Sequence, residues 1–434
     1  MTLPVCQRLR LEMTERIPCK TPGCPNTILA FTAERTNGFC MPCTQAATRR
    51  EREEYVRRNR RDLNEFDGIT DLVEVLKIIH KPRRSDPLIN WIPHATPVDQ
   101  LYTQLTGSDQ IRLAKYAEAL IGTERSDEAR SIVLCLAAFT DASLTNCLRA
   151  LAAHGEIWPS LAFCRASPDI RDELIARIET DKENRNHILL ALAWVGDATV
   201  VELFERWREC PPPWKESLNV SPENYSLEAG WELTDEGKRR DLYLKECTRL
   251  VRGHSTSPQR FRATVPREDC CPWCSRQLTN LVDVVPAECG VSIPLFATGR
   301  IQVTACEICT AFGTIYGEFD ETGQGRWSSL NTRPNHLPED ADAWARLPQD
   351  SLATAGMRSA LFAADDFLPT TFSQLGGHPA WVQDADYPRC PACARRMMFL
   401  AQLDHEEMED MSEGRFYAFV CLSCQTTATS YQQT

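Results

Sequence analysis

The chain has 434 residues and a formal net charge of −12; 43% of its residues are hydrophobic and 25% are charged, as is typical of soluble globular proteins. It contains no run of about 18 apolar residues, and its first residues carry charges where a signal peptide requires an apolar stretch. We therefore expect a cytoplasmic protein of about three domains that does not contact membranes, and its acidic balance argues against general nucleic-acid binding.

Residues 1–62 are predicted to form a zinc finger followed by a basic helix. The second cysteine pair of this region directly precedes a helical pattern, an arrangement similar to the treble-clef finger. The stretch 49–61 holds seven arginines and three glutamates. Such a helix is a candidate for nucleic-acid binding, but we favour a solvated helix with Glu–Arg pairs, or one docked against the acidic remainder of the chain.

Residues 63–245 are predicted to be helical, because apolar residues recur every three or four positions in segments such as "EARSIVLCLAAF". Gly122, Gly155 and Gly196 follow three of these segments, as expected of helix C-caps. An apolar helix, a short turn and a second apolar helix repeat loosely. This pattern is similar to a HEAT-like array, whose stacked helices form an extended binding surface; a compact helical bundle is the alternative.

Residues 246–434 are predicted to be mainly β. Apolar residues alternate on both sides of the cysteine pairs in "RIQVTACEICTAFGTIYGEFD" and "FYAFVCLSCQ". We therefore expect each cysteine pair to lie in a β-hairpin, and two hairpins to hold one metal as a zinc ribbon. The predicted fold class is thus α+β and multidomain, with an N-terminal zinc finger (1–62), a central helical array (63–245) and a C-terminal β domain with two four-cysteine zinc ribbons (246–434).

The metal prediction depends on how the twenty cysteines are spaced. A single Cys-x-x-Cys pair is compatible with a disulfide, a redox site or half of a metal site. Disulfides are rare in a reducing cytosol, and a redox pair requires a helix directly after it. Two pairs together supply the four thiolates of structural zinc, with no open position for catalysis. The three predicted Zn2+ sites consist of Cys19, Cys24, Cys40 and Cys43; of Cys271, Cys274, Cys306 and Cys309; and of Cys390, Cys393, Cys421 and Cys424.

Two points about these sets concern the choice of one ligand and the place of one cysteine pair in the fold. Cys270 is adjacent to Cys271 and is the alternative ligand, although the Cys-Pro-Trp-Cys spacing favours Cys271. Cys390 and Cys393 precede the apolar stretch "MMFLAQLD", which reads as a strand. We expect the metal to tie the start of that strand to the turn that carries Cys421 and Cys424.

The C-terminal region resembles the YwqG-like family, a bacterial domain of unknown function. The resemblance covers about 60–70 residues and lies in "LGGHPAWVQ", "FLAQ" and the closing strand "FYAFVC". The matching residues are Gly376, Gly377, Pro379, Trp381, Phe399, Leu400 and Gln402. The family offers no catalytic residues to carry over, and many members lack the cysteines. Some members are associated with toxin immunity, so the resemblance implies such a role here.

An acidic segment, residues 403–414, lies between the two cysteine pairs of the third set. We therefore expect either a loop that is fixed at both ends or a short helix. Its carboxylates alternate with Met408 and Met411, and acidic side chains with methionine on a rigid support can form a contact patch. A soluble insertion without a partner is the alternative. The predicted partner-binding residues are Glu406, Glu407, Glu409 and Asp410.

No known catalytic motif was found: the sequence lacks a P-loop, Gly-x-Ser-x-Gly, His-Glu-x-x-His and a nucleotide-binding Gly-x-Gly-x-x-Gly. His378 is the one histidine in a tight turn, and a packed turn is its expected role. We therefore predict a non-enzymatic binding protein, specifically an immunity protein that occludes the active site of one toxin with a basic surface. A nucleic-acid- or ribosome-associated zinc protein is the first alternative, and an enzyme of unknown type is the second.

Overall fold

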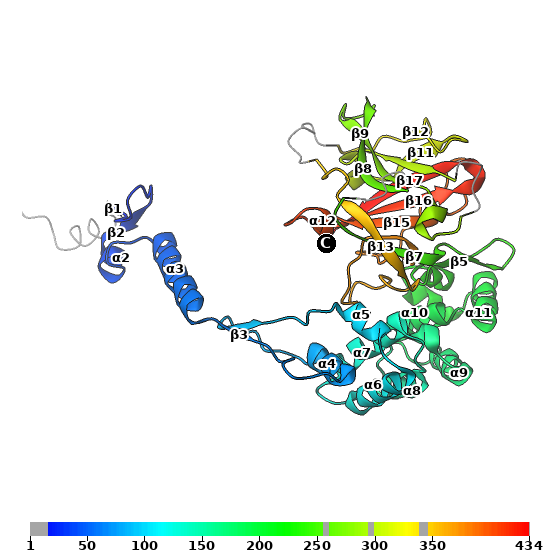
Figure 1. The fold of residues 1–434 in the computed structure, drawn as a ribbon, viewed down its shortest axis with the longest axis horizontal. Coiled ribbons are helices and arrows are strands. Elements are labelled where there is room, and N and C mark those ends of the chain that lie inside the picture. Colours follow the sequence, from blue (N-terminus) through cyan, green and yellow to red (C-terminus); the bar gives the residue numbers. More distant parts are fainter. Residues whose placement is uncertain (1–15, 255–259, 294–298, 338–345, 434) are drawn as a thin grey trace, which may run out of the picture. The chain divides into compact units, whose positions relative to one another are not determined.

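The computed structural model describes residues 16–254, 260–293, 299–337 and 346–433 (Figure 1). These residues belong to two compact units. Unit 1 lies within Met1–Ile69 and Arg83–Ala95, and unit 2 within Thr70–Pro82 and Thr96–Thr434. Helices and sheets are both abundant, which confirms the mixed α+β class.

Unit 1 contains a small antiparallel sheet and one long helix. Its elements are β1 (Arg16–Pro18), β2 (Thr27–Leu29), α2 (Ala30–Arg35), α3 (Met41–Asn59), β3 (Arg61–Leu63) and β4 (Ile89–Trp91). β1 pairs with β2, whereas β3 runs parallel to β4. No residue of α3 is buried. A helix that is polar on every side contributes little to a core, so α3 presents its whole circumference for solvent or a partner.

The helical part of unit 2 is arranged around α7. The helices are α4 (Leu72–His80), α5 (Val98–Thr103), α6 (Gly107–Leu120), α7 (Ser126–Phe139), α8 (Thr145–Ala153), α9 (Pro168–Arg177), α10 (Arg185–Val195) and α11 (Ala198–Glu209), with short 3-10 helices η1 (Ser160–Arg165), η2 (Pro213–Ser217) and η3 (Pro222–Leu227). α7 contacts α4, α5, α6 and η1. Eleven of its 14 residues are buried, so packing covers most of the helix. HEAT-like stacking of these helices stays a prediction.

The ends of these helices follow from capping residues. The Thr106 side chain accepts from the Asp109 N–H while the Asp109 carboxylate accepts from the Thr106 N–H, which forms a capping box at α6. Asp197 caps α11 in a similar way through the Val200 N–H. Gly196 ends α10 in the left-handed conformation, as the sequence predicted. Among the described residues, no helix combines the length and apolar character needed to cross a membrane.

The β part of unit 2 contains an eight-stranded sheet and a three-stranded sheet. The large sheet has the order β12 (Gly325–Trp327), β11 (Ile315–Phe319), β17 (Thr426–Gln432), β16 (Arg415–Cys421), β15 (Met398–Asp404), β14 (Gln374–Gly377), β7 (Leu244–Arg252), β13 (Leu352–Arg358). The small sheet has the order β10 (Ile301–Ala305), β9 (Gln277–Val284), β8 (Phe261–Cys270). A two-stranded ribbon, β5 (Trp231–Leu233) with β6 (Arg239–Asp241), precedes them; α12 (His405–Met408) and the 3-10 turns η4 (Pro286–Cys289), η5 (Cys309–Phe312) and η7 (Leu422–Cys424) lie between strands.

The main β core lies between the two sheets, and β16 shows how the sequence forms it. Phe416, Ala418 and Val420 belong to the core that also contains side chains of β8, β9 and β10. Tyr417 and Phe419 point to the opposite face, where they form a second core. Alternate side chains of a strand face opposite sides of a sheet, so both faces of β16 are covered and the strand is buried along its whole length.

Polar contacts join the helices to the sheets within unit 2. The Trp231 indole N–H donates to the Ala193 carbonyl at 2.9 Å. The Ser359 hydroxyl donates to the Ala138 carbonyl at 2.8 Å, at the end of α7. The helices and sheets that the sequence analysis assigned to separate domains therefore share one compact unit.

Candidate metal centres and partner surface

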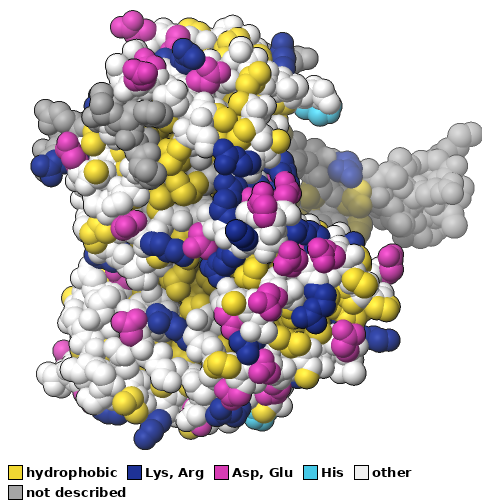
Figure 2. Space-filling view, turned by 90° about the vertical axis from the view of Figure 1, so that its right-hand side faces the viewer, with side chains coloured by type: hydrophobic (Ala, Val, Ile, Leu, Met, Phe, Trp, Pro, Cys, Tyr) yellow, Lys and Arg dark blue, Asp and Glu magenta, His cyan; other side chains and the backbone are white. Residues whose placement is uncertain are grey.

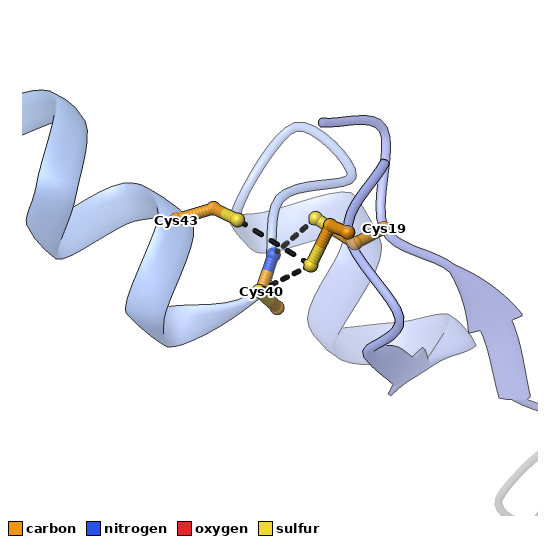
Figure 3. A group of neighbouring side chains, drawn as sticks. Cys19, Cys40 and Cys43 are labelled. Atoms are coloured by element: carbon orange, nitrogen blue, oxygen red, sulfur yellow. Dashed lines mark hydrogen bonds between the residues drawn. The ribbon is translucent and has the colours of Figure 1, made fainter. Parts of the chain in front are cut away.

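The first cysteine cluster is in unit 1, where a loop meets the start of a helix (Figure 3). Cys19 and Cys24 lie in the turn between β1 and β2. Cys40 is the N-cap of α3, and Cys43 lies in its first turn. The Cys40 N–H donates to Cys19 Sγ at 3.3 Å, and Cys24 Sγ lies 3.7 Å from Cys40 Sγ. The arrangement of the second pair at a helix start is the one predicted from sequence.

The second cluster connects the two sheets of unit 2. Cys271 and Cys274 lie in the turn of the β8–β9 hairpin, as predicted. Cys306 and Cys309 follow β10 of the small sheet and precede β11 of the large sheet. The expectation that every cysteine pair lies in a hairpin is wrong for this pair, because β10 and β11 bond to different neighbours.

The third cluster ties two turns beside the large sheet. Cys390 and Cys393 lie just before β15, in a short loop closed by a bridge between Arg389 and Arg396. Cys421 ends β16, and Cys424 lies in the tight turn before β17. Since β15 and β16 are neighbours in the sheet, this cluster joins the start of one strand to the end of the next.

The sulfur positions fit a tetrahedral metal in all three clusters. The four sulfurs of each set lie within 4.8 Å of one another. The contacts Cys271–Cys309, Cys274–Cys306 and Cys393–Cys421 measure 3.7, 3.5 and 3.8 Å. A disulfide requires about 2.05 Å. Four thiolates at about 2.3 Å from a central Zn2+ lie about 3.8 Å apart, so these distances match the edges of such a tetrahedron.

Backbone amides favour the thiolate form, which is the metal-binding form, at one sulfur of the first cluster and at one of the third. The pKa of Cys19 is lowered to about 6, first by the N–H of Cys40 and then by that of Thr21. The pKa of Cys393 is also lowered to about 6, first by the N–H of Arg395. At Cys19 and Cys393 the turn geometry of the chain thus stabilises a negatively charged sulfur.

The structure distinguishes the two adjacent cysteines at the end of β8. Cys271 is buried and its sulfur lies in the second cluster, whereas Cys270 is exposed and outside it. Cys271 is therefore the residue positioned to bind the metal, as its spacing predicted.

The acidic segment 403–414 forms a short helix and a loop, as expected. The Asp404 carboxylate caps α12 by accepting from the N–H groups of Glu406 and Glu407. Met408 is buried in the core between the sheets, whereas Met411 is fully exposed. The two methionines therefore do not form one contact patch: Met408 anchors the segment, and Met411 faces solvent.

The four predicted partner residues differ in whether their carboxylates already interact with other groups of the chain. The Glu407 carboxylate accepts from the N–H groups of Phe372 and Ser373, at 2.6 and 2.9 Å. It is therefore already bound within unit 2. Asp410 forms an exposed ion pair with Arg252 at 2.7 Å. Glu409 lies 3.8 Å from His405. Glu406 is exposed and has no ion pair among the described residues, so it is the most available carboxylate of the four.

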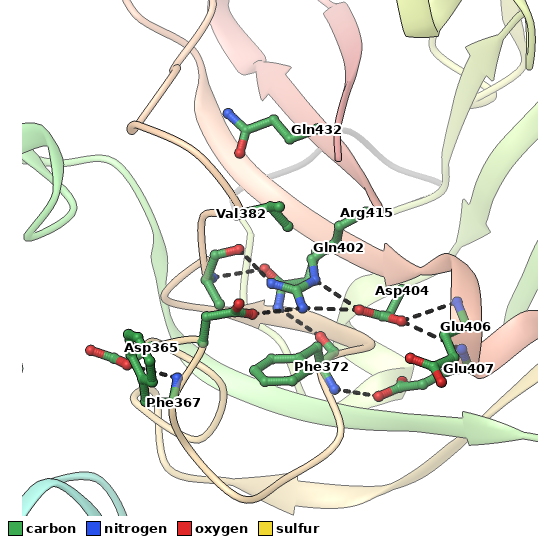
Figure 4. A network of polar contacts seen from close by, with 12 residues as sticks. Asp365, Phe367, Phe372, Val382, Gln402, Asp404, Glu406, Glu407, Arg415 and Gln432 are labelled. Atoms are coloured by element: carbon green, nitrogen blue, oxygen red, sulfur yellow. Dashed lines mark hydrogen bonds and ion pairs between the residues drawn. The ribbon is translucent and has the colours of Figure 1, made fainter. Parts of the chain in front are cut away.

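A polar network centred on Arg415 holds the base of this segment (Figure 4). The Arg415 guanidinium donates to the carboxylates of Asp404 and Asp366, at 2.9 and 3.1 Å, and to the Ala380 carbonyl at 2.8 Å. It also lies over the ring of Phe372. Arg415 was not among the residues predicted from sequence, although a lone arginine at the start of the apolar strand "RFYAFVC" is a signal that a buried cation needs partners.

The residues of the family-like signature have structural roles in this region. Gly376 and Gly377 have φ angles of +70° and +72°, and a Cβ on Gly376 would lie 2.2 Å from the Glu246 carbonyl oxygen, so only glycine fits. The buried Gln402 side chain donates to the Phe372 carbonyl and accepts from the Ala380 N–H. The signature therefore fixes the loops around β14 and β15.

His378, the histidine of the tight turn, is enclosed by packing. Its side chain is buried between Trp194 and Tyr243, with ring centroids 4.7 and 5.0 Å away. Its Nδ1 lies 2.8 Å from the Pro379 carbonyl oxygen. Burial lowers its pKa to about 4, so the imidazole is neutral near pH 7. These contacts are those of a packed turn residue.

Comparison with known proteins identifies a relative over nearly the whole chain. The chain is 51% identical over 426 residues to "Uncharacterized protein YpfL" of Salmonella typhimurium, a match that covers 97% of this chain and 100% of the relative. No family model and no solved structure matches the chain. The resemblance to the YwqG-like family stays a prediction. At this identity and coverage, the chain belongs to the same protein family as YpfL.

Proposed function

We propose that this chain is a cytoplasmic, non-enzymatic binding protein stabilised by three structural Zn2+ ions, and that its acidic unit 2 binds one protein partner with a basic surface. The observation that carries this proposal is the segregation of charge. The segments of unit 1 have a net charge of +4, which leaves −16 for unit 2 within the chain total of −12. Opposite net charge accelerates the encounter with a basic partner.

The zinc part of the proposal follows from the complete four-cysteine clusters. Four sulfurs at tetrahedral spacing leave no position for a substrate, so each ion would hold structure and would not catalyse. The ligands present fit zinc by number, type and separation. Bound zinc would contribute its binding free energy directly to folding.

The partner surface that we propose includes three carboxylates of the segment 403–414: the exposed Glu406 and Asp410, and the half-exposed Glu409. The anchored Met408 and the capped helix α12 hold this segment in place, which reduces the entropy lost on binding. On the face drawn in Figure 2, acidic and basic side chains are intermixed, so the negative charge of unit 2 does not cover that face evenly. A local acidic segment is therefore a better-defined contact than the whole surface.

The narrower proposal is that the partner is a toxin and that this chain neutralises it by covering its active site. Its support is the family-like signature, the lack of a catalytic motif and the negative net charge of unit 2. HEAT-like stacking of α4–α11 would add an extended surface to the same complex. Stoichiometry tests the proposal: we expect one partner molecule to be silenced per chain, without turnover.

The experiment captures partners from the source cells with the purified chain and identifies them by mass spectrometry. Charge reversal of Glu406, Glu409 and Asp410 to Lys should then slow association about tenfold at low salt and leave zinc content unchanged. The matched control is Asp235→Lys, another exposed acid of unit 2. Unchanged association of the triple variant would exclude this surface, and silencing by substoichiometric protein would establish an enzyme.

A second candidate function, nucleic-acid binding by unit 1, is favoured by one observation. α3 is exposed along its length, and Arg50 and Arg52 have no ion pair among the described residues. Glu53 and Glu54 neutralise other arginines of the helix, with Arg49–Glu53 at 3.9 Å. Retention of generic RNA at low salt that is lost on changing Arg57, Arg58, Arg60 and Arg61 to Glu would support this alternative; we expect no such retention, because unit 2 repels phosphates.

A further inference from the structure

A cleft of about 650 Å3 lies within unit 2, a volume typical of small-ligand sites. One wall is a single face of α10, where Asn186, Leu190 and Trp194 are spaced four residues apart. The segment around η3 continues this wall. The opposite wall consists of two loops of the β part, residues 364–367 and 381–385. None of the residues 403–414 lines the cleft, so it is distinct from the surface proposed above.

The cleft is acidic, and three of its carboxylates form no ion pair within the part of the chain that the structure describes. Glu228, Asp365, Asp366 and Asp384 line it. Asp366 is paired with Arg415, but no described lysine or arginine forms an ion pair with the other three. In Figure 4 the Asp365 side chain points away from Arg415. Three uncompensated carboxylates around one cavity attract a cation.

Arg396 is the one cation among the described residues that line the cleft, and it already binds other groups of unit 2. Arg396 Nε lies 3.4 Å from the Glu232 carboxylate, and its Nη1 donates to the Tyr387 carbonyl at 3.2 Å. Glu228 accepts from the Ala385 N–H, at 2.7 Å. Burial, with a smaller contribution from Asp384, raises the pKa of Glu228 to about 7, which is the behaviour of a carboxyl group without a cationic partner.

Aromatic side chains complete the lining. Trp194, Tyr225, Phe367 and Trp381 all border the cleft. Phe367 is 68% exposed although it is a large apolar residue, and its ring lies edge-on to Trp158 with centroids 5.2 Å apart. Aromatic faces beside carboxylates are the environment that binds organic cations, because the ring faces and the carboxylates are both negative.

The spacing of the carboxylates argues against a metal ion. Among the described residues, only the three cysteine sets bring three or more ligand atoms together within 4.8 Å. Metal sites require oxygen ligands at about 2.0–2.6 Å from one ion, hence close to one another. The acids of the cleft are more widely distributed, which suits a cation larger than a metal ion.

We propose that this cleft binds an organic cation, an alkylammonium or guanidinium group that lies against the aromatic rings and between Glu228, Asp365 and Asp384. The group has two possible sources: a free polyamine, or a lysine or arginine side chain of a bound protein. The chemistry of recognition is the same for both. The proposal goes beyond the proposed function and does not depend on it, because no partner contact through residues 403–414 is assumed.

Calorimetric titration of the full chain with two probes tests the proposal. Spermidine represents a free polyamine, and N-acetyl-arginine amide represents a side chain within a protein. We expect saturable 1:1 binding of at least one probe at low salt. Asp365→Asn with Asp384→Asn should weaken it about tenfold, since two nearby negative charges are removed while the size of each side chain and one acceptor oxygen are kept. Phe367→Ala should weaken it about threefold.

Two controls separate a specific effect from a general one. Asp235→Asn removes an exposed charge of unit 2 outside the cleft and should leave the affinity unchanged. Thermal unfolding of each variant checks that the fold is intact. Binding of spermidine alone assigns the cleft to free polyamines, and equal or tighter binding of the arginine probe assigns it to a protein side chain. The proposal is overturned if neither probe saturates at millimolar concentration, or if the Asp365/Asp384 variant binds like wild type.

Discussion

Arg415 and Asp404 are cross-strand partners on β16 and β15, and their side chains form an ion pair at 2.9 Å. Both side chains are largely buried, with exposed fractions of 4% and 14%. Asp404 also caps α12, so this pair connects the ladder of the large sheet to the acidic segment. A buried carboxylate of this kind depends on its cation.

Replacing Arg415 with Met is therefore expected to destabilise unit 2 by about 3–5 kcal/mol, since Asp404 would stay buried without its partner. The double variant Arg415→Met, Asp404→Asn should recover part of this loss, because no unpaired charge remains. Urea unfolding followed by tryptophan fluorescence measures both. Equal stability of Arg415→Met and wild type would contradict the role assigned to the pair.

Removal of one zinc ligand is predicted to affect zinc content and folding together. Elemental analysis should give about three zinc ions per wild-type chain, and about two for Cys421→Ser. The β part of unit 2 should then lose its resistance to proteolysis. Cys270→Ser is the matched control: because Cys270 is exposed and outside the cluster, its zinc content should equal that of wild type. One zinc ion or none in the wild type would refute the prediction.

Two neighbouring glutamates of the acidic segment should respond differently to charge reversal. Glu407→Lys is expected to cost about 1–3 kcal/mol, because the N–H groups of Phe372 and Ser373 lose their acceptor. Glu406→Lys should change the free energy of unfolding by less than about 0.5 kcal/mol, since this side chain is exposed. Denaturant unfolding of the two variants side by side checks the difference, and similar values for both would be the contrary result.

The raised pKa of Glu228 predicts a pH dependence of stability. Its value of about 7, caused mainly by burial, exceeds the value of about 4.3 for an unfolded chain. The folded state thus binds this proton more tightly than the unfolded state, and protonated Glu228 favours folding. This stabilising contribution is complete below about pH 4.3 and is lost as pH rises through about 7. Between these limits, wild type should lose on the order of 2 kcal/mol more stability than Glu228→Gln. Parallel pH profiles of the two proteins would disprove the shift.

The cysteine clusters could be predicted from sequence because their ligands are local. Cys393 and Cys421 are 28 residues apart, and each pair is set by a turn of two to four residues. Helix ends were predictable for the same reason, since Gly196 ends the helix that directly precedes it. The hairpin expectation failed at Cys306 and Cys309 because alternation of apolar residues does not say which sheet a strand joins.

Charge patterns were harder to interpret than spacing. Glu406 and Glu407 are adjacent residues of the same type. In the described structure, however, it is the Glu407 carboxylate that accepts hydrogen bonds from backbone amides, and these belong to a segment about 35 residues away. Met408 and Met411 are also close together in sequence, yet the first is buried and the second is exposed. The acidic cleft was not foreseen either, because its walls come from α10 and from two loops almost 200 residues later. Such sites depend on tertiary contacts that no local pattern contains.

The position of β7 within the large sheet has a consequence for the order of folding. β7 pairs with β13 and β14, and its Cys247 bonds to Gln374, 127 residues further along the chain. The cysteine clusters close over far shorter spans, such as the 38 residues between Cys271 and Cys309. Short loops cost less entropy to close and form faster. During synthesis, the first two cysteine clusters can thus assemble before the last strands of the eight-stranded sheet are made, so we expect closure of that sheet to be a late and slow step.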